Sequence, residues 1–386
     1  MFEKQLDDLD SRHLRRRITT LGSRTGPLVE IDGRPMLLLA SNDYLGLAGH
    51  PEVVQAAVDA TRTYGAGSGA ARLVSGSLPP HEEMEQALAR FKGTATALTF
   101  GSGYLANIGA IPAFIGRGGL ILADRLCHAS LIDGCRLSGA DFRVYRHRDL
   151  EHLESLLVRR NKPKQTLIVT DGVFSMDGDL APLRELVALS QTHEAELYVD
   201  DAHGTGVLGK SGRGTIEHFD LETDIPFHMG TLSKALGSSG GYVAGPESIR
   251  QYLLNACRSF VFTTAPTPGS AGAVTAALAI VQREPERRAR LWRNRDRLCA
   301  GLQMLGFTIP ASASPILPLI IGDAAKAVAF AKQLRQHGVF APAIRPPTVP
   351  DSTSRVRVTV TSEHTIAQID EALDAFRLAG EAAGVL

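Results

Sequence analysis

The chain of 386 residues is long enough for more than one compact core, so we expect one large domain with smaller parts around it. Its 41 basic and 41 acidic side chains cancel, which excludes the strong positive charge that nucleic acids and anionic membranes attract. No apolar stretch approaches the ~20 residues that cross a bilayer, and the acidic N-terminus lacks the pattern of a signal or transit peptide. The four cysteines have no metal-site spacing, so we expect reduced, structural thiols in a cytoplasmic protein.

Residues 1–45 are expected to form an N-terminal segment with a helix and a short hairpin. A basic run, Arg-His-Leu-Arg-Arg-Arg at 12–17, follows three acidic residues in this segment. We interpret the run first as the solvated face of a helix and second as part of a ligand site.

Residues 46–280 are expected to form the large domain, because short apolar runs alternate there with amphipathic helical patterns. The runs predict strands at 95–100, 120–123, 142–145, 166–170, 196–200, 227–229 and 242–244. Helices are predicted at 82–91, 150–157 and 183–189, the last after Pro182. This alternation is typical of an α/β fold with a mostly parallel, seven-stranded sheet covered by helices on both faces.

The sequence pattern changes after about residue 280. A charged helical stretch at 283–303 is followed by strand-like segments at 316–321 and 355–360. Helices are expected at 325–336 and from about 366 onward. These elements predict a smaller α+β domain over residues 281–386.

Polar residues follow the predicted strands of the large domain, at the ends where parallel sheets bind ligands. These residues are Ser102, His128, Ser175, Asp200, His203 and Lys234. Because they converge on one edge of the sheet, they are stronger evidence for a site together than any of them is alone.

Asp200 ends an apolar run, and Lys234 lies in a glycine-flanked turn after the next apolar run. This pairing suits pyridoxal phosphate (PLP). A lysine amine can form a Schiff base with the cofactor aldehyde, and a carboxylate can keep the pyridine nitrogen protonated so that the ring withdraws electrons. The alternatives are an exposed surface lysine and a helix-cap or turn aspartate, although neighbouring Asp201 fits the capping role better.

The segment Phe-Gly-Ser-Gly-Tyr-Leu-Ala-Asn at 100–107 follows a strand and opens a helix, where backbone N–H groups can bind phosphate. It half matches a dinucleotide fingerprint, but Ala106 stands where the third glycine belongs. A ribose-binding acid at the required spacing is also missing. These departures argue against a nucleotide-binding oxidoreductase.

The other polar residues each have a structural alternative. His128 could stack on a pyridine ring or be a core histidine. His203 could bond the phenolic oxygen of the cofactor or be satisfied by backbone, and Ser175 could be a turn serine. Arg345 and Arg357 could each grip a carboxylate through two parallel bonds, or belong to surface ion pairs.

Taken together, these segments resemble the α-oxoamine synthases, PLP-dependent transferases of the aspartate-aminotransferase fold, also called fold type I. The resemblance covers nearly the whole chain. It is carried by Ser-Asn-Asp-Tyr-Leu-Gly at 41–46, Asp-Arg-Leu-Cys-His-Ala-Ser at 124–130, the Asp200 and Lys234 motifs, and the arginine–proline loop at 343–350. Cys127 departs from the family pattern, which has serine before the histidine.

The resemblance implies a role for each candidate residue. Lys234 would carry PLP, Asp200 would contact the pyridinium nitrogen, and His128 would stack on the ring beside the substrate. The further implied cofactor contacts are Gly103, Tyr104, Ser175, His203 and Thr231, with Thr263 and Thr264 reaching the phosphate of the partner subunit in a homodimer. The implied substrate contacts are Arg15, Asn42, Arg345, Thr348 and Arg357, the last binding the amino-acid carboxylate.

Within the family, the loop at 343–350 points to the members of the biotin pathway that join L-alanine to a pimeloyl thioester and release CO₂. The sequence does not distinguish between coenzyme A and an acyl carrier protein as the acyl carrier. Glycine C-acetyltransferase and 5-aminolevulinate synthase remain alternatives, because one methylene changes discrimination by only ~1–3 kcal/mol. A long-chain sphingoid-type synthase is disfavoured by the lack of a membrane-anchoring segment, and a PLP-free binding protein by the presence of Lys234, Asp200 and His128 together.

Overall fold

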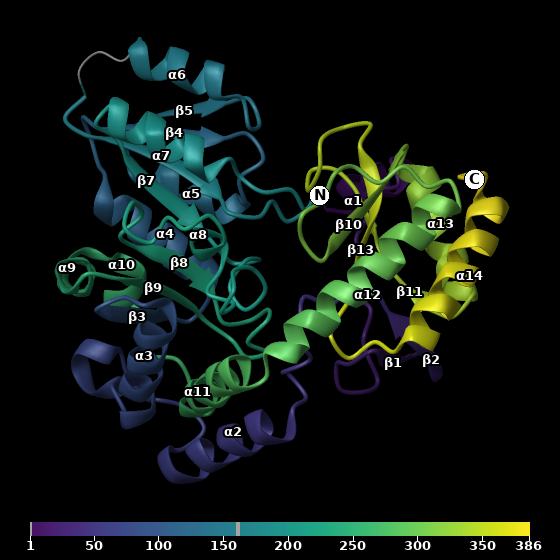
Figure 1. Cartoon of the computed structure of the whole chain (residues 1–386), viewed down its shortest axis with the longest axis horizontal. Coiled ribbons are helices and arrows are strands. Elements are labelled where there is room, and N and C mark those ends of the chain that lie inside the picture. The colour runs from purple at the N-terminus through teal and green to yellow at the C-terminus, as the bar shows by residue number, and fades with distance from the viewer. Residues whose placement is uncertain (1, 160–162) are drawn as a thin grey trace. The chain divides into compact units, whose positions relative to one another are not determined.

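The computed structural model describes residues 2–159 and 163–386, which form two compact units (Figure 1). The first unit comprises the chain up to Gly49, Met176–Asp179 and Glu286–Leu386, and the second comprises His50–Ser175 and Leu180–Pro285. The N-terminal residues therefore share a unit with the C-terminal part of the chain. The division into three parts at 45/46 and 280/281 stays a prediction.

The second unit is built on a seven-stranded sheet with the order β3-β9-β8-β7-β6-β4-β5. Its strands are β3 (Thr96–Phe100), β4 (Leu120–Asp124), β5 (Asp141–Tyr145), β6 (Thr166–Asp171), β7 (Glu196–Asp200), β8 (His228–Thr231) and β9 (Gly241–Gly245). Only β9 runs against the others in this sheet. The predicted α/β fold with a mostly parallel, seven-stranded sheet is confirmed, as is each predicted strand.

Helices cover both faces of this sheet because its central strands are apolar on both sides. Ile121 and Ala123 of β4 pack in one core with α4 (Gly103–Phe114), α5 (Ala129–Leu137) and α9 (Glu247–Ala256). Leu120 and Leu122 pack in the other core with α6 (Leu150–Val158), α7 (Leu183–Thr192) and α8 (Thr215–His218). Successive residues of the strand thus serve opposite faces.

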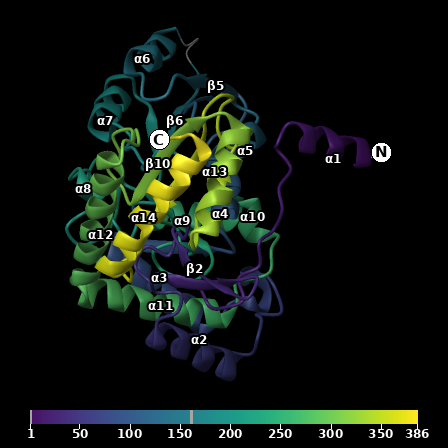
Figure 2. The same ribbon diagram turned by 90° about the vertical axis from the view of Figure 1, so that its right-hand side faces the viewer.

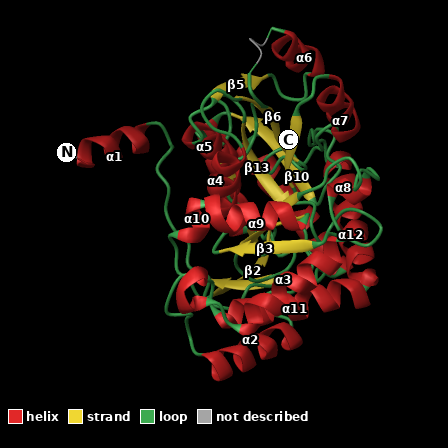
Figure 3. Ribbon diagram, turned by 90° about the vertical axis from the view of Figure 1, so that its left-hand side faces the viewer, coloured by secondary structure: helices red, strands yellow, loops and turns green. Residues whose placement is uncertain are grey.

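Four further helical elements complete the second unit: α2 (Pro51–Tyr64), α3 (Pro79–Lys92), α10 (Arg258–Val261) and α11 (Pro268–Arg283). A short π-helical turn, η1, spans Arg72–Gly76. Helix α11 packs against both α2 and α3 (Figure 3). Gly269 and Gly272 of α11 allow this close approach, because a Cβ atom at either would lie within 3 Å of α2 atoms.

The first unit contains two three-stranded sheets, β1-β2-β11 and β10-β13-β12. Their strands are β1 (Leu28–Ile31), β2 (Arg34–Leu38), β10 (Ile316–Gly322), β11 (Val339–Phe340), β12 (Ala343–Ile344) and β13 (Ser354–Thr359). The helices are α1 (Phe2–Ser11), α12 (Pro285–Met304, of which Pro285 belongs to the second unit), α13 (Ala324–Gln336) and α14 (Ile366–Ala383). Figure 2 shows α13 and α14 side by side, in agreement with their mutual contacts. The predicted smaller α+β region and N-terminal hairpin are confirmed.

One interpretation of the N-terminal segment was wrong. Helix α1 ends at Ser11, so the basic run at 12–17 lies beyond it and is not a helix face. The three acidic residues lie in the second half of α1, and the basic residues that follow them lie in a turn and irregular backbone.

The four cysteines are free and buried. In residues 2–159 and 163–386, every helix is too short or too polar to cross a membrane.

His364 of the first unit is a buried histidine that is satisfied only in its neutral form. Its Nδ1 accepts the N–H of Thr361 at 2.9 Å, and its Nε2 lies 3.2 Å from the carbonyl oxygen of Leu38. A proton on Nδ1 would face a backbone donor. Burial accordingly lowers the pKa of His364 from 6.5 to about 4.

We predict that His364 makes the protein less stable as the pH falls from about 6.5 towards 4. Between these values the unfolded chain binds a proton that the folded chain excludes, which costs about 1.4 kcal/mol per pH unit. His364→Gln should be the less stable protein at pH 8, and the gap to wild type in urea-denaturation free energy should narrow at pH 6 and pH 5. A gap that is constant or widens would contradict this assignment.

Candidate active site

The polar residues singled out in the sequence lie at one edge of the seven-stranded sheet. Ser102 follows β3, His128 follows β4, Ser175 follows β6, Asp200 ends β7 with His203 three residues later, and Lys234 follows β8. These five strands run in the same direction, so their carboxyl ends share an edge. All six residues belong to the second unit.

Asp200 is a buried carboxylate with a hydrogen-bond donor at each oxygen. It is only 4% exposed. Its side chain shares the α4 face of the sheet with Tyr198, two residues earlier, as strand alternation requires. Asn107 of α4 donates its amide to Oδ2 at 2.7 Å, and the backbone N–H of Ala202 donates to Oδ1 at 2.9 Å. These bonds stabilise the ionised form and fix its orientation.

A second carboxyl group, Asp171, lies opposite Asp200 in the register of β6 and β7. Burial raises the pKa of Asp171 well above its ordinary value, and the charge of Asp200 raises it further. Its Oδ2 accepts the backbone N–H of His128 at 2.8 Å. Asp171 and Asp200 thus form a pair of adjacent acids at the ends of neighbouring strands, and ionisation of both would be costly.

His128 precedes α5 and is partly exposed at the same edge. Its Nδ1 lies 2.7 Å from the Ser130 hydroxyl and 3.2 Å from the Ser130 N–H. Desolvation lowers the pKa of His128, while the Asp200 carboxylate raises it and the Lys234 ammonium lowers it.

The loop after β7 is held by a buried ion pair. Lys92 of α3 and Asp201 are both fully buried, with Nζ 3.4 Å from Oδ2. Asp201 also accepts the Thr215 hydroxyl at 2.7 Å and the Thr215 N–H, at the first residue of α8. Asp201 therefore binds the first residue of α8, in keeping with the helix-capping role expected for it. Its bonds to Lys92 and Thr215 hold the loop that carries buried His203.

Thr231 and the turn that contains Lys234 pack closely on the start of β9. Thr231 is buried, and its hydroxyl donates to the carbonyl oxygen of Gly240 at 2.9 Å and lies 2.9 Å from the Ser233 hydroxyl. Lys234 is half-buried in the turn that follows. The turn therefore presents a lysine and exposed Ser233 at the edge of the sheet.

The start of helix α4 forms a narrow cradle beside this turn. Ser102 caps the helix by accepting the N–H of Leu105 at 3.1 Å. A Cβ atom at Gly241 would lie 2.6 Å from both the Ser102 carbonyl oxygen and the Gly103 Cα. Backbone N–H groups at such a helix start can bind the phosphate of a cofactor. Tyr104 is half-exposed here, and its hydroxyl donates to Asp133 of α5.

Asn42 and Arg357 lie together in the first unit. Arg357 of β13 is 8% exposed. Its Nη2 donates to Asn42 Oδ1 at 3.0 Å and lies 3.4 Å from the Tyr44 hydroxyl. The guanidinium thus contacts two neutral oxygens of the segment 41–46, those of Asn42 and Tyr44.

The remaining substrate candidates form a second cluster in the first unit. Arg345 donates to the carbonyl oxygen of His13 and, at 3.4 Å, to that of Arg15. Thr348 accepts from Arg16 at 3.0 Å, and the Arg15 side chain pairs with Asp10. The arginine–proline loop and the N-terminal segment are therefore in contact.

Thr263 and Thr264 lie in the second unit, between α10 and α11. Thr263 is half-buried and Thr264 is exposed. Their position is that of a surface segment, next to Phe262, which is 72% exposed.

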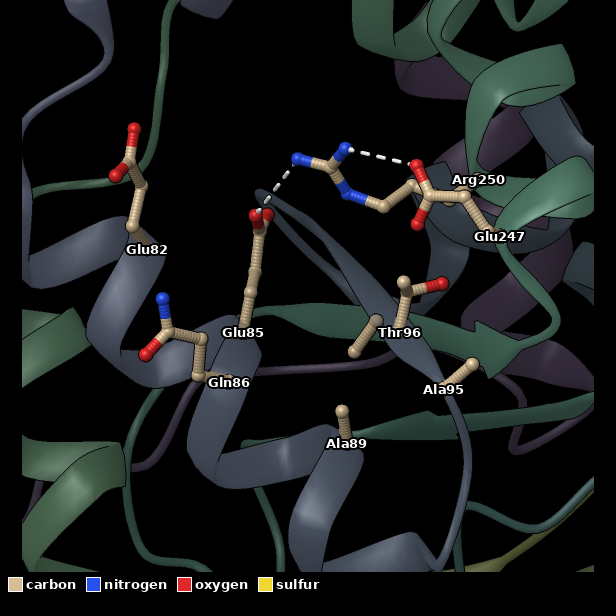
Figure 4. Close-up of a pocket in the computed structure, with 9 residues that line it drawn as sticks. Glu82, Glu85, Gln86, Ala89, Ala95, Thr96, Glu247 and Arg250 are labelled. Atoms are coloured by element: carbon tan, nitrogen blue, oxygen red, sulfur yellow. Dashed lines mark ion pairs between the residues drawn. The ribbon is translucent and has the colours of Figure 1, made fainter.

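The pocket of about 360 Å³ in Figure 4 lies elsewhere in the second unit, against the first residues of β3. Its central acid, Glu85, pairs with Arg72 at 2.8 Å and with Arg250 at 3.8 Å, and accepts the Thr99 N–H. Arg250 also pairs with Glu247. These groups neutralise one another at the amino end of the strand, so the pocket is not part of the candidate site.

Sequence reasoning missed several buried residues that hold the site, namely Lys92, Asn107, Ser130, Asp171 and Tyr198. Asn107 could have been recognised from the sequence, since a single amide in an otherwise apolar helix requires a hydrogen-bond partner. Nothing in the sequence marks Lys92, because a lysine near a helix end is ordinarily exposed.

Comparisons with known proteins agree with this geometry. The model of the family "Aminotransferase class I and II" matches residues 34–376. The 8-amino-7-oxononanoate synthase of Anaeromyxobacter dehalogenans is 50% identical over 95% of this chain and 92% of its own. The enzyme of the same name from Geobacter sulfurreducens is 47% identical over 99% of this chain and 98% of its own.

Two solved structures are similar over most of the chain. A serine palmitoyltransferase variant from S. paucimobilis with bound PLP and myriocin has a TM-score of 0.95 and 33% identity, covering 100% of this chain and 98% of that one. The 8-amino-7-oxononanoate synthase from Francisella tularensis has a TM-score of 0.77 and 28% identity, covering 91% of this chain and 98% of that one.

We predict that Gly241→Ala weakens the binding of added PLP by roughly 5- to 150-fold, because the new Cβ would displace the backbone of residues 102–103 and overpacking of this kind costs ~1–3 kcal/mol. The matched control is Gly116→Ala, at the other edge of the sheet, where the new Cβ would meet its nearest atom, the Ser138 carbonyl oxygen, at 3.8 Å. Fluorescence titration with PLP would measure both variants. Equal affinities for Gly241→Ala and the control would show that the cradle does not bind the cofactor.

Proposed function

The chain belongs to the class I and II aminotransferase family, and on this premise we propose that it catalyses the decarboxylative condensation of L-alanine with a pimeloyl thioester. The product would be 8-amino-7-oxononanoate, a precursor of biotin. The observation that carries the proposal is the identity of 47–50% to two proteins of that name over nearly the full chain.

The cofactor is pyridoxal phosphate, which when bound withdraws electrons from the amino acid and makes its Cα proton acidic. The residues at the sheet edge fit this cofactor. Asp200 offers a carboxylate oriented by two hydrogen bonds for a pyridinium nitrogen, and the start of α4 at Gly103, against which Gly241 packs, would offer backbone N–H groups for a phosphate. Thr231, Ser175 and His203 are proposed to complete the cofactor contacts, with His128 against the ring.

Lys234 is proposed to hold the cofactor and then to act as the base. Once the amino acid has replaced it, the free amine of Lys234 takes the Cα proton, and it returns a proton after the new C–C bond has formed and CO₂ has left. Transfer is efficient only if the Cα–H bond points at this amine. Arg357 is proposed to fix that orientation by binding the carboxylate of alanine, with Asn42 holding the guanidinium.

Arg15, Arg345 and Thr348 are proposed to bind the acyl substrate. Their support is the contact between the arginine–proline loop and residues 13–16, which places several arginine side chains around one loop. Coenzyme A and an acyl carrier protein are both anionic carriers, and a cluster of arginines suits either.

We also propose that the chain works as a cytoplasmic homodimer. Exposed apolar side chains lie on elements of the second unit that contact one another: Leu73 and Val74 of η1 near α10, Phe262 after α10, and Tyr104 at the start of α4. Such a patch is typical of a subunit interface. Thr263 and Thr264 follow Phe262, and we propose that they reach the phosphate in the partner subunit.

One observation favours a second candidate, a serine palmitoyltransferase activity. The similar structure of that name has the higher TM-score, 0.95 against 0.77. Sequence identity favours the first candidate, 50% against 33%. Because the shared fold fixes the cofactor chemistry and not the acyl pocket, sequence identity is the better guide to substrate.

The experiment is an assay of thiol release with matched substrate pairs. We expect kcat/KM with L-alanine and pimeloyl-CoA to exceed, by roughly tenfold or more, that with glycine and acetyl-CoA, glycine and succinyl-CoA, or L-serine and palmitoyl-CoA. Preference for one of the other pairs would replace the proposed substrates and leave the fold and cofactor unchanged.

Two variants test the residue roles in the same assay. Lys234→Ala should lower turnover by roughly 10³-fold, because it removes the base as well as the covalent anchor. Asp200→Asn should slow exchange of the alanine Cα proton by roughly 10²-fold, because it removes the charge that the pyridinium nitrogen needs. Near-normal rates would refute either role.

A further inference from the structure

A continuous chain of hydrogen bonds, buried from Asp200 to Ser130, connects Asp200 to His128 through Asn107 and Ser130. Asn107 and Tyr198 are fully buried, and Ser130 is 1% exposed. The Tyr198 hydroxyl lies 2.9 Å from Asn107 Oδ1. Asn107 Nδ2 lies 2.7 Å from Asp200 Oδ2 and 2.8 Å from Ser130 Oγ. Ser130 Oγ in turn lies 2.7 Å from His128 Nδ1.

The direction of every bond in this chain follows from the Asp200 carboxylate. An ionised carboxylate only accepts, so the Asn107 atom that faces it must be the NH₂ group. That orientation turns Oδ1 towards Tyr198, whose hydroxyl donates to it. The second hydrogen of the NH₂ group points at Ser130 Oγ, which therefore accepts it.

The Ser130 hydroxyl determines which ring nitrogen of His128 carries the proton. Because Ser130 Oγ already accepts from Asn107, its own hydrogen is directed to His128 Nδ1. The backbone N–H of Ser130 also faces Nδ1, at 3.2 Å. A ring nitrogen that faces two donors carries no proton, so the neutral imidazole has its hydrogen on Nε2.

We infer that Asn107 and Ser130 are positioning residues that hold Asp200 as an oriented carboxylate and His128 as the Nε2–H tautomer. The effect of this network on cofactor binding rests on the proposed function, because Asp200 and His128 are the two groups proposed to contact the cofactor ring. The network itself is a property of the chain alone. It leaves the second ring nitrogen of His128, Nε2, protonated and therefore a donor.

The first test uses the apoprotein, so that it does not depend on cofactor chemistry. ¹⁵N NMR of histidine-labelled protein, with the His128 signals identified by their loss in His128→Gln, reports which ring nitrogen carries the proton. We expect an unprotonated Nδ1 and a protonated Nε2 at alkaline pH. A protonated Nδ1 would overturn the inference.

The variant Ser130→Ala removes one hydroxyl and leaves the Asn107–Asp200 bond in place. The groups that face His128, namely Asp200, Lys234, Asp133 and Asp171, are also retained. Loss of the donor to Nδ1 destabilises the neutral ring, so an NMR titration should show the pKa of His128 raised by roughly one unit. Ser130→Thr keeps a hydroxyl and should restore the wild-type value. An unchanged titration in Ser130→Ala would contradict the role of Ser130.

Asn107→Leu tests the bond to Asp200. We expect the affinity for PLP to fall by roughly tenfold, because a hydrogen bond to a buried charge is lost. Asn294→Leu is the control for general destabilisation, since Asn294 is also buried and donates to the backbone carbonyls of Thr361 and His364 in the first unit. This control should bind PLP within about twofold of wild type. Wild-type affinity in Asn107→Leu would overturn the role of Asn107. Failure of the wild-type protein to bind PLP would instead count against the proposed function, and the NMR result alone would then test the hydrogen-bond network.

Discussion

The candidate site depends on keeping one carboxylate ionised inside the protein. Burying the charge of Asp200 is costly unless hydrogen bonds replace water. The structure supplies them from Asn107 and the backbone of Ala202, and burial raises the pKa of the neighbouring acid, Asp171. A charge prepared in this way can stabilise a cation on a ligand without the protein having to rearrange.

The surrounding backbone is packed to keep that charge and the adjacent loops in place. The buried pair of Lys92 and Asp201 fixes the loop that carries His203. At the start of β9, Gly241 lets the backbone of residues 102–103 approach to distances that a side chain would forbid. The site is thus assembled from segments far apart in the sequence, each held by a contact that tolerates little change.

The sequence predicted the architecture well because strand and helix periods are local properties. Asp200 and Lys234 could be recognised because each follows an apolar run, and parallel strands bring their carboxyl ends to one edge. The link from Asn107 to Asp200 and Ser130 escaped notice because these partners lie 93 and 23 residues away from Asn107 along the chain. The basic run at 12–17 was misjudged because charge pattern alone does not show where a helix ends.

The central claim is that Lys234 binds the cofactor opposite the Asp200 carboxylate. The most direct measurement is to reduce the PLP-treated protein with borohydride, digest it and locate the pyridoxyl group by mass spectrometry. The account predicts modification of Lys234 together with loss of the visible absorption band. Modification of another lysine in its place, or no stable modification at all, would contradict it.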